Sequence, residues 1–229
     1  MKLLIVRPQP GASETAARAR KLGLDPVVSP LFEIRPLRWQ APDPEGFDAL
    51  LLTSANAVRH GGGGLARFVR LPCYAVGEAS AEAAREAGFG DVRTGPGDAA
   101  AAAAMMEKDG VRRAFHPCGR DRAGLGEPGI DIVHVPVYAA DPIDELPADA
   151  KAALDAGPLV LVHSPRSGAL LARLVPNKAG VAVAAISAAA AQAAGGGWRS
   201  VAVASAPSDE ALLELAAKLC QTEGHGPRS

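Results

Sequence analysis

The chain has few aromatic residues and almost no net charge, and each shortage excludes a class of partner. Aromatic side chains make up 4% of the 229 residues, which is too few for the stacking platforms that bind single-stranded nucleic acid. The 24 basic and 25 acidic side chains give a formal charge of −1, so the composition favours neither nucleic acid nor an anionic membrane. We therefore expect neither as a partner.

Long apolar runs and paired cysteines are also missing. No window reaches the roughly 18 uninterrupted apolar residues of a membrane span. A strand predicted at residues 2–6 leaves no room for a signal sequence, so we expect a cytoplasmic protein. We also expect a monomer. Cys73, Cys118 and Cys220 are odd in number and lack a CxxC pair, which predicts three reduced thiols and no disulfide.

The motifs of the common cofactor and nucleophile sites are absent. The sequence has no GxxxxGK[ST] loop, no GxGxxG after a strand and no GxSxG elbow. His116, His134 and His163 lie within or at the ends of predicted strands and are not at ligand spacing along the chain, so we expect no metal site. We also expect no cofactor.

One pattern is present twice. The segment FDALLLTSANAV returns as GPLVLVHSPRSG, so that Ser54 and Ser164 are equivalent and lie 110 positions apart. The same separation relates Gly77 to Ser187 in YAVGEASAEAAREAG and AAISAAAAQAAGGG. Each copy is an apolar run that ends at a small residue and continues as an Ala-rich helix. A unit this long is not a solenoid repeat and predicts two similar α/β domains.

Strands and helices alternate along the whole chain. The predicted strands are 2–6, 25–34 with an interruption at Pro30, 49–52, 73–76, 92–94, 114–116, 130–138 with a break at Pro136, 159–162, 181–186 and 201–204. The predicted helices are 11–22, 55–68, 80–87, 98–108, 148–156, 166–174, 188–194 and 208–219. Ser13 and Gly23 are expected to cap the first helix, and Gly61–Gly64 is expected to form a flexible loop.

The matching of segments between the two copies predicts an unusual connectivity. RRAFHPCGRD, which closes the first copy, matches MKLLIVRPQP at the N-terminus, and IVHVPVY matches PVVSPLF, with Tyr138 at the place of Phe32. The fold class is therefore two similar parallel-sheet α/β domains, joined by a two-stranded linker, with a ligand cleft between them. The expected boundaries are a discontinuous domain at 1–34 plus 142–221, a continuous domain at 37–137, crossings at 35–36 and 138–141, and a disordered tail at 222–229.

Ligands of open parallel sheets bind at the carboxyl ends of the strands, where helix N-termini face an anion. The residues predicted there are mostly small or hydroxylic, with two arginines. The candidate binding residues are Arg7, Ser54, Asn56, Gly77, Ser80, Gly119, Arg120, Ser164, Ser167 and Ser187. For each serine the simpler interpretation is helix capping, which is compatible with binding a carboxylate, and for each arginine it is solvation.

Tyr138 stands at the end of the strand that leads into the second crossing. One interpretation is a packing aromatic like Phe32. The alternative is a phenol that donates a proton to a leaving hydroxyl as a weak general acid.

Seven segments together resemble the uroporphyrinogen-III synthase family in order and spacing. They are LLLTSANAV, YAVGEASAEAAREAG, RAFHPCGRDR, VHVPVYAA, VLVHSPRSGALL, AISAAAAQAA and VASAPSDEALLELA. The resemblance implies a HemD-like fold and a cofactor-free lyase. Its substrate would be the linear tetrapyrrole hydroxymethylbilane, which the family cyclises with inversion of the last ring to give uroporphyrinogen III.

The resemblance also assigns residues. A family tyrosine proposed to assist loss of the hydroxyl falls on Tyr138, and the family's cleft hydroxyls fall on Ser54, Ser80 and Ser164. Where the family often has Gly-x-Thr-Thr-Ala, this chain has Ser187 followed by four alanines, which favours recognition by main-chain donors. The alternative function is a non-catalytic, two-lobed, hinged protein that binds or senses an anionic small molecule.

Overall fold

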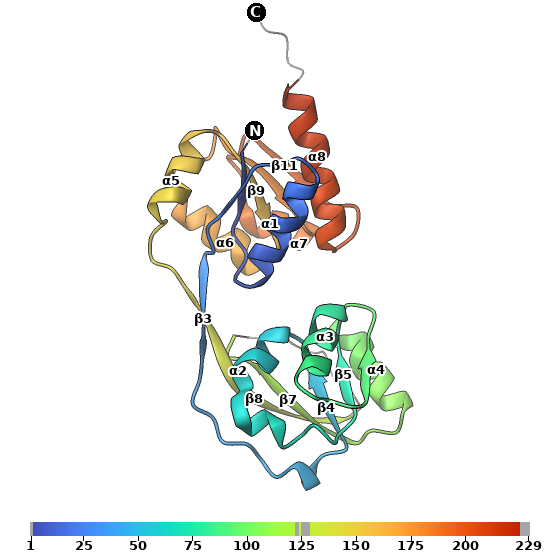
Figure 1. Ribbon diagram of the computed structural model, residues 1–229. Helices are drawn as coiled ribbons and strands as arrows, with labels where there is room; N and C mark the ends of the chain where they lie inside the picture. Colours follow the sequence, from blue (N-terminus) through green and yellow to red (C-terminus); the bar gives the residue numbers. More distant parts are fainter. Residues whose placement is uncertain (1, 122–123, 125–128, 225–229) are drawn as a thin grey trace, which may run out of the picture. The chain divides into compact units, whose positions relative to one another are not determined.

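The structure is a computed structural model that describes residues 2–121, 124 and 129–224 (Figure 1). The chain divides into two compact units. Residues 1–33 and 141–229 form the first, here called the split unit, and residues 34–140 form the second, the continuous unit. Both units are α/β, as the sequence predicts.

The split unit is built on a parallel sheet of five strands in the order β11-β10-β9-β1-β2. The strands are β1 (Leu3–Ile5), β2 (Pro26–Val28), β9 (Leu159–Val162), β10 (Ala182–Ala185) and β11 (Ser200–Val203). Leu3 is opposite Leu159 and Ile5 is opposite Leu161. Through this pairing the N-terminal strands lie in the same sheet as the strands of the second copy.

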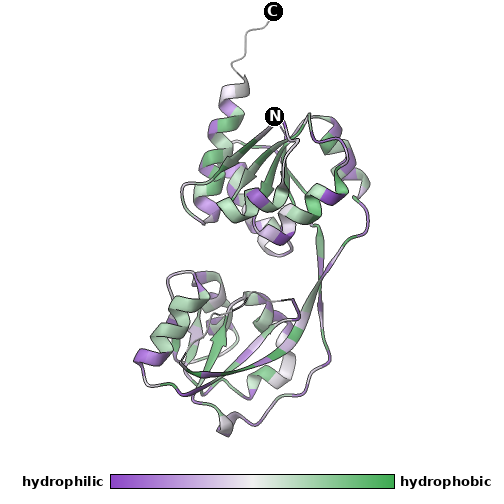
Figure 2. Cartoon of the chain, turned by 180° about the vertical axis from the view of Figure 1, so that it is seen from behind, coloured by the Kyte–Doolittle hydropathy of each residue, from purple (hydrophilic) through white to green (hydrophobic). Residues whose placement is uncertain are grey.

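Helices cover both faces of this sheet. They are α1 (Gly11–Lys21), α5 (Ala148–Asp155), α6 (Pro165–Leu174), α7 (Ala188–Ala194) and α8 (Asp209–Gly224). Alanines of α1 and leucines of α8 pack on Leu3, Ile5 and Leu161 in one buried cluster. Each fully buried leucine of this kind contributes roughly 1.5–3 kcal/mol to folding. Figure 2 shows the same division, with hydrophobic strands inside the unit and hydrophilic residues on its helices.

The continuous unit has a sheet of six strands in the order β3-β8-β7-β4-β5-β6. The strands are β3 (Phe32–Pro36), β4 (Ala49–Leu52), β5 (Cys73–Ala75), β6 (Val92–Thr94), β7 (Arg113–Gly119) and β8 (Asp131–Pro142). Five of them repeat the order of the split unit, and β3 adds an edge. The chain passes from one unit to the other within β3 and within β8.

Helices α2 (Ala55–Ala66) and α3 (Glu78–Glu86) pack on one face of this second sheet, and α4 (Ala99–Lys108) packs on the other. A short 3-10 helix, Pro44–Gly46, precedes β4. Alternate residues of β4 enter the two cores, Leu50 on the α2 side and Leu51 on the α4 side, as the period of a strand buried on both faces requires.

Two prolines have different effects on the strands. Pro30 separates β2 from β3, as the sequence predicts. The break predicted at Pro136 is wrong, because β8 is continuous through it. Cys118 is opposite Pro136 and Gly119 is opposite Tyr138, so the register shifts there. The missing N–H of proline is accommodated by a β-bulge rather than by the end of the strand.

The prediction of a loop at Gly61–Gly64 is wrong. This glycine run lies inside α2, where two helical segments meet at a kink at Gly62, which has a φ of 59°. A Cβ at Gly64 would lie 2.8 Å from the ring of Trp39, and the Trp39 indole N–H donates to Gly61 O at 3.1 Å. The glycines therefore make room for a packed tryptophan and supply its acceptor.

The ends of two helices also differ from the predictions. Ser13 is not the cap of α1, because Pro10 holds that position and the Ser13 hydroxyl donates to Gln9 Oε1 at 2.9 Å. Gly23 does follow α1 at φ 75°, as predicted for a residue past the C-cap. Helix α8 extends to Gly224, so residues 222–224 of the predicted tail are helical, and 225–229 lie outside the described residues.

Cys73, Cys118 and Cys220, which all lie in the described part of the chain, form no disulfide. Among the described residues, no helix is long and apolar enough to cross a bilayer.

Candidate functional site

The repeated strand-to-helix turns place the predicted serines at helix N-termini. Ser54 caps α2 and accepts from the Asn56 N–H at 3.2 Å. Its counterpart Ser164 caps α6 and accepts from the Ser167 N–H at 3.1 Å. Gly77 and Ser187 hold the same position on α3 and α7. The capping interpretation is thus confirmed for Ser54, Ser164 and Ser187, and the 110-residue register extends to the caps.

Two of the predicted binding residues are buried, so little of their surface is accessible to a ligand. Ser80, in the first turn of α3, is 7% exposed, and Ser167, in α6, is 2% exposed. The Ser167 hydroxyl lies 2.9 Å from the Ser164 hydroxyl. Asn56 differs from both, because its side-chain oxygen is buried and has no hydrogen-bond partner in the part of the chain that the structure describes.

Tyr138 and Gly119 are brought together by the bulge between β7 and β8. A Cβ at Gly119 would lie 2.9 Å from Cζ and 3.0 Å from the hydroxyl of Tyr138. The Tyr138 ring also lies near His60, with ring centroids 6.2 Å apart. Tyr138 is half-buried and contacts the α2-side core. Its phenol therefore has a defined place at the carboxyl edge of the sheet, which a side chain at position 119 would obstruct.

Arg120 follows β7 directly. Its backbone N–H donates to Tyr138 O at 2.9 Å, which extends the β7–β8 pairing by one bond. The side chain is 44% exposed and forms an ion pair with Asp121 at 3.4 Å. An exposed pair of this length contributes little stability, so the guanidinium can exchange this partner for another anion.

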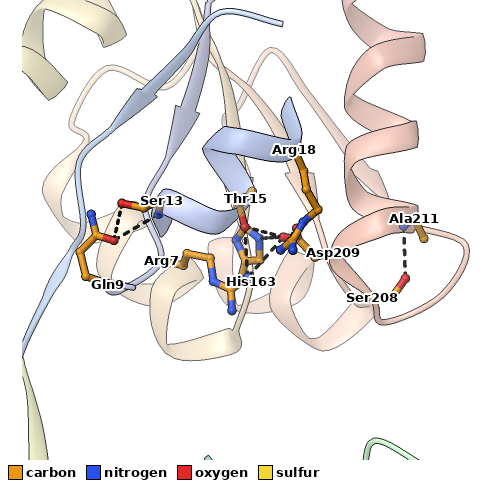
Figure 3. A network of polar contacts seen from close by, with 9 residues as sticks. All are labelled: Arg7, Gln9, Ser13, Thr15, Arg18, His163, Ser208, Asp209 and Ala211. Atoms are coloured by element: carbon orange, nitrogen blue, oxygen red, sulfur yellow. Dashed lines mark hydrogen bonds and ion pairs between the residues drawn. The ribbon is translucent and has the colours of Figure 1, made fainter. Parts of the chain in front are cut away.

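Arg7 follows β1 in the split unit and belongs to a network centred on Asp209 (Figure 3). Asp209 is the first residue of α8, and its carboxylate receives four donors. They are Thr15 Oγ1 at 2.7 Å, His163 Nε2 at 2.8 Å, Arg7 Nη1 at 3.3 Å and Arg18 Nη2 at 2.7 Å. The Arg7 guanidinium also lies over Gly11, whose Cβ would be 2.7 Å from it.

Burial and hydrogen bonding set the protonation of this network. Burial alone would raise the pKa of Asp209, but hydrogen bonds from His163, Thr15 and Arg18 outweigh it and lower the pKa below its usual value. Burial lowers the pKa of His163, although its hydrogen bond to Asp209 opposes that shift. At neutral pH the network therefore holds one carboxylate and two guanidinium groups, and carries an excess of positive charge.

The sequence did not reveal Thr15, Arg18 and Asp209, which come from α1 and α8. Asp209 could have been found from its place at the start of a helix that follows a parallel strand, because residues at such places lie along the same edge of the sheet. A contact between two of the histidines was not predicted either. His116 of β7 is opposite His134 of β8, and their Nδ1 atoms lie 2.9 Å apart. They come together through strand register, which spacing along the chain does not show.

The carboxyl edge of each sheet is suited to bind anions. N–H groups at the starts of α2, α3 and α6 carry partial positive charge. Arginines add full charge at two strand ends, Arg7 in the split unit and Arg120 in the continuous unit. Tyr138 supplies a hydroxyl that can give a proton.

Comparison with known proteins gives a consistent result. A family model described as uroporphyrinogen-III synthase HemD matches residues 13–214. Curated protein sequences give no significant match. The crystal structure of uroporphyrinogen-III synthetase from Helicobacter pylori is similar, with a TM-score of 0.67 and 21% identity over 95% of this chain and 99% of that one.

A mutant uroporphyrinogen III synthase from Thermus thermophilus has a TM-score of 0.51 at 18% identity, over 96% of this chain and all of that one. At these identities the structures show a shared fold of two α/β domains with parallel sheets. The family model covers strands and helices of both units. The chain belongs to the uroporphyrinogen-III synthase family.

Proposed function

We propose that the protein is a uroporphyrinogen-III synthase, a lyase that cyclises hydroxymethylbilane to uroporphyrinogen III without a cofactor. The observation that carries the proposal is the family match over residues 13–214, which includes nearly all the strand ends described above. The shared fold and the anion-binding character of those strand ends agree with it.

The reaction defines what the protein has to supply. The terminal hydroxyl of the linear tetrapyrrole leaves as water, and the resulting azafulvene cation is attacked by the substituted carbon of the last ring. A spiro intermediate then fragments and recloses with that ring inverted. Closure without inversion is chemically easy, so the enzyme has chiefly to hold the chain in the conformation for attack at the hindered carbon.

Substrate binding is assigned to the carboxyl edges of the two sheets. The substrate carries several carboxylates, and backbone N–H groups at helix N-termini bind such groups without a matching number of cationic side chains. Arg7 and Arg120 contribute charge to this binding. The proposed binding residues are Arg7, Ser54, Asn56, Gly77, Ser80, Gly119, Arg120, Ser164, Ser167 and Ser187.

Tyr138 is proposed as the catalytic residue. Its hydroxyl donates a proton to the departing hydroxyl of the substrate, so that water leaves instead of hydroxide. The close approach of the ring to Gly119 and its contact with His60 support this role, because they hold the phenol in one orientation at the edge of the sheet. We further propose that the protein acts as a monomer in the cytoplasm.

The function is tested by supplying hydroxymethylbilane to the purified protein, oxidising the products to porphyrins and separating the isomers. We expect the type III isomer at a rate proportional to protein concentration. A product mixture equal to the enzyme-free control, which is the type I isomer, would refute the synthase. If such a protein still bound the substrate tightly, the binding or sensing function would replace the proposal.

A further inference from the structure

Three side chains that the proposed reaction does not use gather in the continuous sheet. His116 and Cys118 are two residues apart on β7 and so face the same side. His134 is opposite His116 on β8. One ligand atom from each of the three lies within 4.8 Å of the others, so the cluster brings two imidazoles and a thiol to one point.

We propose that His116, Cys118 and His134 form a binding site for a zinc-type transition-metal ion. Two nitrogens and one sulfur are ligands that zinc accepts in tetrahedral geometry, with a fourth position left for water. This proposal replaces the expectation of no metal site. It does not depend on the synthase activity, and no step of the reaction is assigned to the ion.

The distance between the two imidazole nitrogens fits a metal after a small adjustment. The two Nδ1 atoms are 2.9 Å apart and share a proton. Zinc–nitrogen bonds of about 2.0–2.1 Å in tetrahedral geometry separate two ligand nitrogens by roughly 3.3 Å. The imidazoles therefore have to part by only a few tenths of an ångström when the ion replaces the proton.

A neighbouring hydroxyl already supports the required form of His116. The Thr53 hydroxyl lies 2.9 Å from His116 Nε2. When Nδ1 binds a metal, Nε2 carries the proton and donates it to Thr53 Oγ1. Such a partner fixes the orientation and the tautomer of a ligating histidine, and its loss typically weakens metal binding about 10–100-fold.

Burial of two ligands makes the site selective, and partial exposure of the third leaves a route of entry. His116 and Cys118 are each 1% exposed, so the thiolate formed on binding is shielded from water and gains most from a cation. His134 is half-buried and provides the side from which the ion enters. A buried His-Cys-His set disfavours magnesium and calcium, which prefer several oxygen ligands.

The test uses the full-length protein stripped with a chelator and titrated with Co²⁺, followed by competition with Zn²⁺. We expect one equivalent of Co²⁺ to bind with a thiolate-to-metal charge-transfer band, and Zn²⁺ to abolish that band. Cys118→Ser should lose the band. Cys220→Ser changes a thiol in the split unit and serves as the matched control, which should retain it.

Thr53→Val provides a second measurement that does not remove a ligand. We expect it to keep the band and to weaken Co²⁺ binding by at least about tenfold. Circular dichroism of each variant establishes that it is folded. The absence of a charge-transfer band in the folded wild-type protein, or a band that persists in folded Cys118→Ser, would overturn the proposal.

Discussion

Gly119 and Tyr138 are opposite one another across a β-bulge, and the tyrosine ring occupies the space that a side chain at position 119 would fill. The bulge follows Pro136, which cannot donate in the ladder. A proline, a glycine and a shifted register thus act together to place one phenol. Substitutions at Gly119 and at Tyr138 show whether that placement matters for catalysis.

Gly119→Ala should displace the Tyr138 ring and lower kcat. The added Cβ would be 2.9 Å from Cζ, at the far end of a side chain that can move. Gly119 does not have a positive φ, so alanine is tolerated by the backbone, and the free energy of unfolding should change by less than about 1 kcal/mol. Steady-state kinetics and thermal unfolding measure both effects.

Gly46→Ala is the matched control for this substitution. It lies in the same unit, and a Cβ there meets no atom within 4 Å. Its kcat should equal that of the wild-type protein. Equal kcat for Gly119→Ala as well would show that the position of the ring is unimportant.

Tyr138→Phe should lower kcat by roughly 100-fold if the phenol is the general acid. The other tyrosine, Tyr74, is buried, donates to Asp109 at 2.7 Å and accepts from Arg93 at 2.6 Å. Tyr74→Phe should leave kcat unchanged and reduce the free energy of unfolding by about 1 kcal/mol. An unchanged kcat in Tyr138→Phe would assign that residue to packing.

Arg120→Ala should raise KM more than it lowers kcat, because the exposed guanidinium is proposed to bind a substrate carboxylate. Arg113→Ala removes an arginine from the other end of β7, where it pairs with Asp131, and should leave KM as it is. Initial rates over a range of substrate concentrations distinguish the two. If the two variants have the same KM, Arg120 does not contact the substrate.

Asp209→Ala should destabilise the split unit by about 2 kcal/mol, between the values for exposed and buried ion pairs.

The wild-type protein should also lose stability on acidification. The pKa of His163 is lowered from 6.5 in the folded state, so the unfolded state binds more protons below that pH, and stability falls as the pH falls. The lowered pKa of Asp209 adds a second loss below about 3.8.

His163→Gln isolates the contribution of His163 to the loss of stability on acidification. Thermal unfolding between pH 8 and pH 5 should show a shallower loss of Tm in this variant than in the wild-type protein. Identical slopes would mean that His163 does not titrate differently in the two states.

The two tyrosines allow a further test by ultraviolet titration. Burial and the hydrogen bond to Asp109 raise the pKa of Tyr74 from 10.0 to about 12. The difference between wild-type protein and Tyr74→Phe should thus show one phenol that ionises near pH 12. Because the unfolded state loses this proton earlier, stability should fall as the pH rises above 10. Ionisation near pH 10 in the folded protein would contradict the buried hydrogen bond.

Local patterns in the sequence predicted the elements well, because each apolar run and each helix cap depends on neighbouring residues. Ser54 and Ser164 were assigned to helix capping from their place after a strand, and both cap helices. The repeat also predicted that the N-terminal strands belong with the second copy, and β1 pairs with β9. Errors arose where a distant residue decides, as at Gly64, which contacts Trp39.

The candidate site was less accessible to prediction. Arg7 was chosen by its position after a strand, but its partner Asp209 lies 202 residues away in the sequence. The pairing of His116 with His134 depends on the register of β7 and β8. A bulge shifts that register further along the same two strands, between Cys118 and Gly119. Side-chain contacts between strands and helices that are distant in sequence are set by tertiary packing, and single-sequence patterns do not contain them.

The central position of β1 in its sheet has a consequence for biosynthesis. This strand is synthesised before the continuous unit, yet one of its two neighbours, β9 (Leu159–Val162), follows only after the whole of that unit. The continuous unit is complete before β9 is synthesised, and local contacts form faster than distant ones. The apolar residues of β1 therefore stay exposed to solvent during synthesis until β9 and the helices that follow it have been made.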